Sequence, residues 1–244
     1  MKKFFKLSYT KIIFFAFFAN TILLTVASAQ TEPSDKSPKK INGGFAHLNF
    51  SGEQLNLANL NSLLSFNNYG AISSTNFSFG GSGAYVINNF IAGGGGAWLT
   101  NSKTGNSSNS LDLKGGYGYF NFGYVVRSNK HSLLYPTVGI GGGGYTILVN
   151  KNNQQNDFSQ QLKSPSGMIS LDAGGWMTTI QLTYQYYLSK KTLEGFCIGI
   201  KAGYKYSPYN WSTKMNNTTL ANSPKINMNG FYLTIILGGG GTFN

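Results

Sequence analysis

Cysteine, histidine and acidic residues are scarce in this sequence of 244 residues, and each scarcity excludes a class of protein. Cys197 is the one cysteine, so internal disulfides cannot stabilise the fold. The cysteine and the two histidines show no metal-ligand spacing, and we therefore expect no metal site and no cofactor. Stability must come from another source.

Long hydrophobic runs are absent after the first 29 residues. Four lysines form a basic start, residues 12–26 are mostly apolar, and Ala27-Ser28-Ala29 is a small-x-small cleavage site. This pattern predicts a cleaved signal peptide at 1–29 and a flexible, proline-containing periplasmic leader at 30–40. A retained anchor is the alternative, but the apolar core is shorter than the about 20 residues that a spanning helix needs.

Negative charge is in the minority in the exported part of the chain. Without residues 1–29, 15 basic residues stand against 7 acidic ones, a net charge of +8. An exported chain does not meet nucleic acid, and these lysines form no dense run, so we expect no nucleic-acid partner. Lipid phosphates are the acidic neighbours that we expect instead.

Alternation of apolar and polar residues dominates the rest of the sequence. In residues 174–188 the even positions are apolar, as at Trp176 and Ile180, whereas the odd positions are polar, as at Thr179 and Gln181. A period of two indicates a β-strand with two different faces. The pattern predicts eight strands, at 41–50, 73–87, 90–101, 109–126, 133–149, 167–188, 194–209 and 226–243.

The connections between these strands are short at every second position. Residues 88–89, 127–132 and 189–193 form short connections, and each is shorter than both of its neighbours. Long and short connections alternate in this way when both chain ends lie in the periplasm. The sequence therefore predicts an all-β fold, an eight-stranded antiparallel up-and-down transmembrane barrel over residues 41–244, in the bacterial outer membrane.

Charged side chains are too few to cover the predicted strands of a soluble protein. Residues opposite the apolar face are mostly Gly, Ser, Thr, Asn and Gln, which suits a narrow barrel interior with the apolar face turned to lipid. Aromatic residues gather near strand ends, as in an interfacial girdle. The girdle residues that we predict are Trp98, Trp176, Tyr184, Tyr206, Tyr209 and Trp211. The alternative interpretation is that these aromatic residues belong to the core of a soluble β-protein.

Taken together, these features resemble the small outer-membrane barrels of the OmpA/OmpX type, and the glycine-rich strands are similar to those of uncharacterised barrels from the Bacteroidota. The resemblance covers residues 41–244 and is architectural. It implies that the last strand carries a signal for the barrel-insertion machinery, with Phe243 as its aromatic residue, here penultimate and followed by Asn244.

Four charged residues are predicted to face the barrel lumen: Asp112, Lys114, Lys201 and Lys205. The assignment of the first two places a break in alternation, such as a bulge, near Tyr119-Phe120. A charged constriction would make a narrow passive pore for small solutes. A salt-bridged plug is the favoured alternative, because eight-stranded barrels are usually filled by side chains.

Catalytic residues are hard to find in this sequence. An enzyme similar to the lipid A-modifying barrels would need a nucleophile and a base on one rim of the barrel. His47 lies on the polar face of the first strand, towards its outer end, with Ser51 and Glu53 beyond it, and a Ser-His-Glu grouping is conceivable there. A structural or solvated histidine is the commoner case. We expect that the chain is not an enzyme and that no residue is catalytic.

The first long connection, 51–72, differs from the others. Ser51 to Gln54 resemble a helix capping box, and leucines follow at helical spacing, at 57, 60, 63 and 64. We predict a short helix that packs on the barrel, with a membrane or partner contact as the alternative. Lysines in the outer loops, at 103, 151, 163, 214 and 225, are candidates for pairing with lipopolysaccharide phosphates. The predicted function is a structural, adhesion or assembly role carried by the extracellular loops, with no protein partner indicated.

Overall fold

The alternation seen in the sequence becomes a two-faced wall in the computed structural model. The structure describes residues 40–67, 69–105, 109–151, 169–189, 193–208, 214–215, 218–219 and 226–243. The predicted signal peptide and all but the last residue of the predicted leader lie outside these residues and stay predictions. Residues 40–244 form one structural unit.

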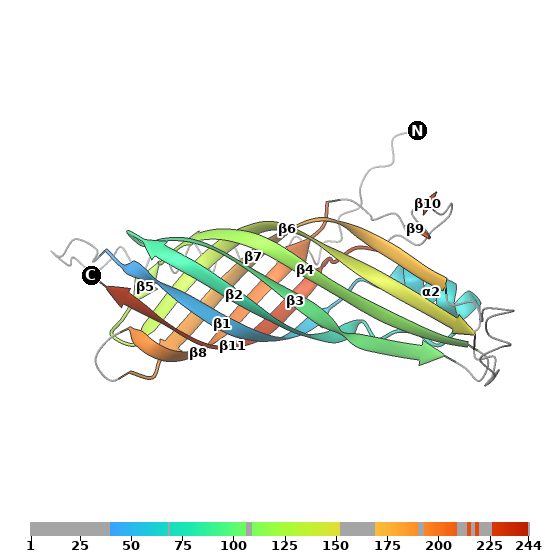
Figure 1. Ribbon diagram of the computed structural model, residues 1–244, viewed down its shortest axis with the longest axis horizontal. Coiled ribbons are helices and arrows are strands. Elements are labelled where there is room, and N and C mark those ends of the chain that lie inside the picture. Colours follow the sequence, from blue (N-terminus) through green and yellow to red (C-terminus); the bar gives the residue numbers. More distant parts are fainter. Residues whose placement is uncertain are drawn as a thin grey trace, which may run out of the picture. The chain divides into compact units, whose positions relative to one another are not determined.

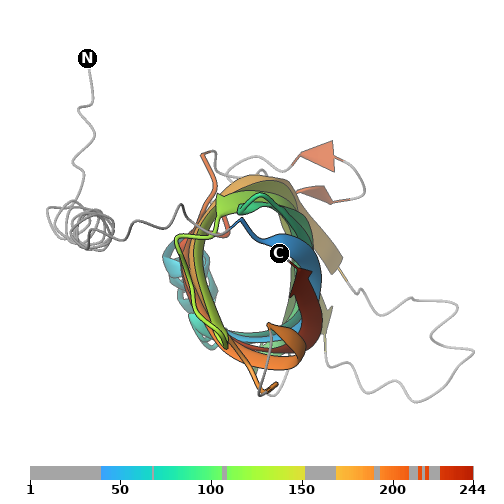
Figure 2. The ribbon, with the colours of Figure 1, turned by 90° about the vertical axis from the view of Figure 1, so that its left-hand side faces the viewer.

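Eight long antiparallel strands make the wall, and the ring closes where β1 pairs with β11. Figure 1 shows the tilted strands from the side, and Figure 2 shows the ring that they form. This confirms the predicted eight-stranded barrel. In order around the ring, the strands are β1 (Asn42–Gln54), β2 (Thr75–Ile87), β3 (Phe90–Gly105), β4 (Asn109–Tyr124), β6 (Ser132–Lys151), β7 (Ile169–Tyr187), β8 (Glu194–Tyr206) and β11 (Gly230–Phe243). Three short pieces pair outside the ring, namely β5 (Arg127–Ser128), β9 (Lys214–Met215) and β10 (Thr218–Thr219).

The tight turn between β2 and β3 shows how local chemistry fixes the register. Asn88 and Asn89 have φ angles of 50° and 72°, the left-handed pair that a two-residue hairpin requires and that asparagine tolerates. The Asn89 side-chain oxygen accepts a hydrogen bond from the Ile41 amide at 2.9 Å, and that of Asn42 accepts one from the Asn88 amide at 2.9 Å. The turn is therefore bound to the start of β1. We call this end of the barrel the turn end.

The outer face of the wall is apolar over a broad band. Phe77, Tyr85, Phe120 and Ile198 alternate with buried neighbours and are themselves exposed, as are many other apolar side chains on every long strand. No helix among the described residues is both long and apolar enough to span a membrane. β6 and β7 contain 20 and 19 residues, against the about 9–11 that a crossing strand needs. Both strands are therefore longer than a crossing of a bilayer requires.

The helix in the first long connection is α2 (Ala58–Phe66), and it lies at the end of the barrel opposite the turn end (Figure 1). The predicted helix is present, but the predicted capping box is wrong. Residues 51–54 continue strand β1, and Leu57 at the helix start makes no side-chain cap. Hydrogen bonds of β1 to both β2 and β11 keep this segment extended, so the helix starts later. We call this end the helix end.

Candidate functional site: the barrel interior

An apolar layer closes the interior at the helix end, and we call it the outer plug. Leu60 and Leu64 of α2 are buried and belong to one cluster with inward side chains of the wall. Packing of this kind is strongly favourable, because a fully buried Leu or Ile contributes about 1.5–3 kcal/mol relative to an exposed one. The wall contributes, among others, Leu99, Leu111, Leu113, Tyr145, Ile147 and Met228.

A second apolar layer, the inner plug, closes the interior at the turn end. The rings of Phe45 and Tyr135 stack with centroids 5.5 Å apart, and Leu133, Tyr187 and Cys197 are fully buried beside them. The Tyr135 hydroxyl donates to the side-chain oxygen of Gln185 at 3.0 Å. The aromatic groups thus pack on one side and satisfy their polar ends on the other.

Polar and charged side chains fill the layer between the two plugs. Lys205 of β8 and Glu53 of β1 form an ion pair whose side chains are 1% and 0% exposed. Glu53 also accepts hydrogen bonds from Ser78 and, at 2.6 Å, from the Tyr117 hydroxyl. The lysine ammonium lies 4.1 Å from the centroid of the Tyr117 ring. The three hydrogen-bond donors around this buried carboxylate compensate for the hydration that it loses on burial.

The predicted lumen charges divide into two pairs. The structure places Lys201 and Lys205 in the interior, where they are 4% and 0% exposed. It places Asp112 and Lys114 on the outer face, so the prediction that these two face the lumen is wrong. β4 keeps one alternation along its length, with Leu111, Leu113 and Tyr119 inward, and no break occurs at the predicted position. Oδ2 of Asp112 lies 3.8 Å from Nζ of Lys103, which is on the outer face as well.

The conceivable catalytic grouping on β1 does not form. His47, Ser51 and Glu53 all face inward, but a strand rises about 3.4 Å per residue, so His47 and Ser51 are about 14 Å apart along it. Ser51 shares a hydrogen bond of 2.7 Å with Thr234, Glu53 pairs with Lys205, and His47 stacks on Phe45. The Ser-His-Glu prediction is wrong for this geometry, and the expectation that the chain is not an enzyme stays a prediction.

The predicted girdle aromatics that the structure describes all lie on the outer face. Trp98 and Trp176 are 73% and 69% exposed, and Tyr184 and Tyr206 are 47% and 52% exposed. Tyr209 and Trp211 lie outside the described residues. The backbone of Phe243 pairs with Asn42 at the turn end, and the role of this residue in insertion stays a prediction.

Comparisons with known proteins give matches of architecture alone. No protein-family model and no curated protein matches the sequence. Ail of Yersinia pestis, solved in complex with the heparin analogue sucrose octasulfate, is 15% identical, with a TM-score of 0.44 over 83% of this chain and 99% of Ail. OprG of Pseudomonas aeruginosa is 10% identical, with a TM-score of 0.40 over 84% and 97%. The Escherichia coli protease OmpT gives a TM-score of 0.26 at 10% identity over 88% and 100%.

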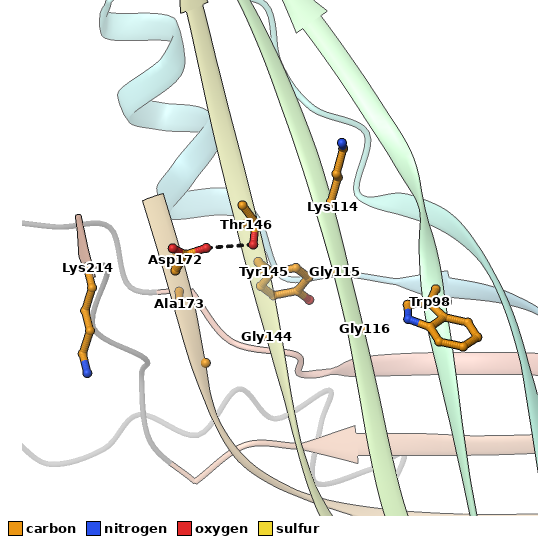
Figure 3. Close-up of a pocket in the computed structure, with 11 residues that line it drawn as sticks. Trp98, Lys114, Gly115, Gly116, Gly144, Tyr145, Thr146, Asp172, Ala173 and Lys214 are labelled. Carbon is orange, nitrogen blue, oxygen red and sulfur yellow. Dashed lines mark hydrogen bonds between the residues drawn. The ribbon is translucent and has the colours of Figure 1, made fainter. Parts of the chain in front are cut away.

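This chain is a closed eight-stranded antiparallel β-barrel with an apolar outer face. Its outer wall carries a shallow hollow near the helix end, shown in Figure 3. Gly116, Gly144 and Gly174 pair across three strands and present no side chains, so the wall is thin there. At the edge of the hollow, Thr146 donates to Asp172 at 2.8 Å. Lys114, Lys214 and Trp98 also line it.

Sequence reasoning missed Glu53 as a partner of Lys205 because it ended the first strand of the barrel at residue 50. The inward parity of Phe45 and His47 continues to Glu53, and this continuity was the available signal. The outward positions beyond Phe50 lose their apolar character at Gly52 and Gln54, so the alternation that marks a lipid-facing strand disappears there. The strand itself continues through its backbone pairing with β2 and β11.

Proposed function

We propose that this barrel is closed to solutes and serves a structural, adhesion or assembly role through its extracellular loops. The observation that carries the proposal is the filled interior, with a buried ion pair between two apolar plugs. The described interior cavity beside Lys201 offers only about 10 Å³ to a water-sized sphere, which is room for about one water molecule. Side chains therefore occupy the space that the ring of strands encloses.

The direction of the barrel in the membrane follows from its connections. Three long connections, the one that contains α2 and those of residues 152–168 and 207–229, join strands at the helix end. The β3–β4 connection at the same end has only residues 106–108, so the predicted alternation of lengths does not hold there. The connections at the turn end, 88–89, 125–131 and 188–193, are all short. In outer-membrane barrels the longer loops face outward and the shorter turns face the periplasm. The helix end would then be extracellular, and the outer plug would be the layer next to the cell exterior. N-terminal sequencing of the exported protein tests the predicted cleavage after Ala29.

Conductance recording separates the closed barrel from the narrow passive pore. The full chain, refolded and inserted into planar lipid bilayers, should give no steady current across a wide voltage range, because no continuous water path crosses the two plugs. A large open barrel inserted under the same conditions shows that the bilayer reports conduction. Steady, reproducible single-channel steps from this chain would overturn the closed barrel and favour the pore.

Loop lysines are the described groups best suited to an acidic surface. Lys103, which the structure places in strand β3 and not in a loop, is 71% exposed, and Lys214 of β9 is exposed at the edge of the helix end. If these residues bind lipopolysaccharide phosphates, reversal of the loop lysine charges should weaken retention in the outer membrane and raise detergent sensitivity. The set to change is Lys103, Lys151, Lys163, Lys214 and Lys225. Unchanged retention and sensitivity would remove phosphate pairing from the proposal and leave the closed barrel intact.

A further inference from the structure

The polar layer between the plugs carries more positive than negative side chains. Glu53, Lys201 and Lys205 are the charged residues that the described part of the chain buries. Glu53 pairs with Lys205, whose ammonium group it contacts directly. Lys201 is left with no carboxylate within ion-pair distance among the described residues. An isolated buried ammonium group is costly unless another charge compensates for it.

A small cavity lies beside this uncompensated lysine. Phe45, His47, Asn121, Thr183 and Lys201 contribute to its lining. The Lys201 ammonium makes one long contact, of 3.4 Å, with the hydroxyl of Ser82, which also lines the cavity. The lysine therefore retains hydrogen-bonding capacity toward the cavity.

Three other polar atoms at this cavity have no hydrogen-bond partner among the described residues. They are Nε2 of His47, Oδ1 of Asn121 and Oγ1 of Thr183, on side chains that are 5%, 7% and 0% exposed as residues. Buried polar atoms are nearly always satisfied, so a cluster of unsatisfied ones around a hollow indicates a bound species. His47 and Thr183 can both donate, and rotation of the Asn121 amide would present its NH2 group as a further donor.

We propose that this cavity binds one small monovalent anion of the halide class. The anion neutralises Lys201 and accepts hydrogen bonds from His47 and Thr183. The space of about 10 Å³, close to the volume that one water molecule needs, admits at most a monatomic ion and excludes phosphate, sulfate and carboxylates. Water alone would satisfy the donors but would leave the net charge of the layer unbalanced.

The plugs determine how such an ion enters. Because apolar layers close the interior at both ends, the ion is captured as the barrel folds and then exchanges slowly with solvent. Retention after removal of free salt is therefore the property to measure. The full chain is refolded into detergent micelles in sodium bromide and desalted into sodium gluconate. Bound bromide is then measured by inductively coupled plasma mass spectrometry.

Wild-type protein should retain bromide in proportion to protein, and Lys201→Met should retain at least about tenfold less, because hydrogen bonds to a charged group contribute about 1.5–3 kcal/mol. Lys114→Met, which removes an exposed lysine from the outer face, is the matched control and should retain bromide like the wild type. Equal retention by wild type and Lys201→Met, or none by the wild type, would overturn the proposal.

Loss of bromide from Lys201→Met could also result from misfolding, and heat-dependent mobility in gels detects misfolded protein. A second variant therefore tests the site without removing its charge. Thr183→Val keeps the charge and removes one donor, so it should lose bromide faster than the wild type. Crystals grown in bromide provide the position, and an anomalous peak between Lys201 and His47 is the expected result. A peak elsewhere, or ordinary water density at the cavity, would contradict the assignment.

Discussion

The buried ion pair offers the sharpest test of how the interior is held closed. Lys205→Met removes the ammonium group and leaves a side chain of similar length between Tyr117 and Tyr232, whose rings the lysine faces at 4.1 and 5.6 Å. Glu53 then keeps its negative charge in a site with no exposure to solvent. The variant therefore isolates the effect of an uncompensated carboxylate.

The expected magnitude depends on the contacts that remain. Removal of one partner from a buried ion pair destabilises proteins by about 3–5 kcal/mol. Ser78 and Tyr117 still donate to the carboxylate, and each such bond contributes about 1.5–3 kcal/mol, so we expect the lower end, about 3 kcal/mol. Adding Glu53→Gln removes the charge while its amide oxygen still accepts from both donors. The double variant should recover most of the lost stability.

The measurement is urea unfolding of the full chain in detergent micelles, followed by tryptophan fluorescence. Lys114→Met serves as the control, because an exposed lysine on the outer face should change the free energy of unfolding by less than about 0.5 kcal/mol. A Lys205→Met variant within about 1 kcal/mol of the wild type would refute the reasoning. So would a double variant less stable than the single one.

Three further predictions concern the wall, the helix and the membrane. Gly141→Ala should destabilise the barrel strongly, because the new Cβ would lie 2.0 Å from the backbone oxygen of Gly118. In Gly118→Ala the nearest atom to the new Cβ is 3.7 Å away, so this variant should be tolerated. The urea midpoints of the two variants test the difference. Leu60→Ala should cost about 2–4 kcal/mol in the same assay, while Leu63→Ala, at a position 41% exposed, should have little effect. A variant that keeps Trp176 as its only tryptophan should be quenched by lipids brominated in their acyl chains, and unquenched fluorescence would contradict a lipid-facing position.

Local patterns predicted most of the wall correctly. Period-two alternation placed Trp176 and Ile180 outside and Gln181 inside, as the structure has them, because each strand must keep one face toward lipid. The sequence also predicted the Asn88-Asn89 turn correctly, because the conformation of a two-residue turn depends on its own residues. Helical spacing of leucines likewise identified α2.

Two errors concern charged side chains. Asp112 and Lys114 were assigned to the inward parity together with a break in alternation near Tyr119-Phe120, yet β4 has no such break and both residues face outward near the helix end. The parity of a strand is continuous, but the environment that each face meets changes with height above the bilayer. Glu53 was not recognised as the partner of Lys205 because β1 loses its apolar outer face before it ends.

The sequence by itself determined the strand pattern, the turn chemistry and the two-faced wall, because these depend on residues close together in the chain. Tertiary structure alone decided which interior residues meet. Glu53 and Lys205 are 152 positions apart, and ring closure of β1 against β11 brings them together. The same closure leaves Lys201 without a carboxylate partner among the described residues and sets the two plugs above and below it. Among the described residues, which of the two buried lysines receives the carboxylate of Glu53 depends on barrel register, a property of all eight strands together.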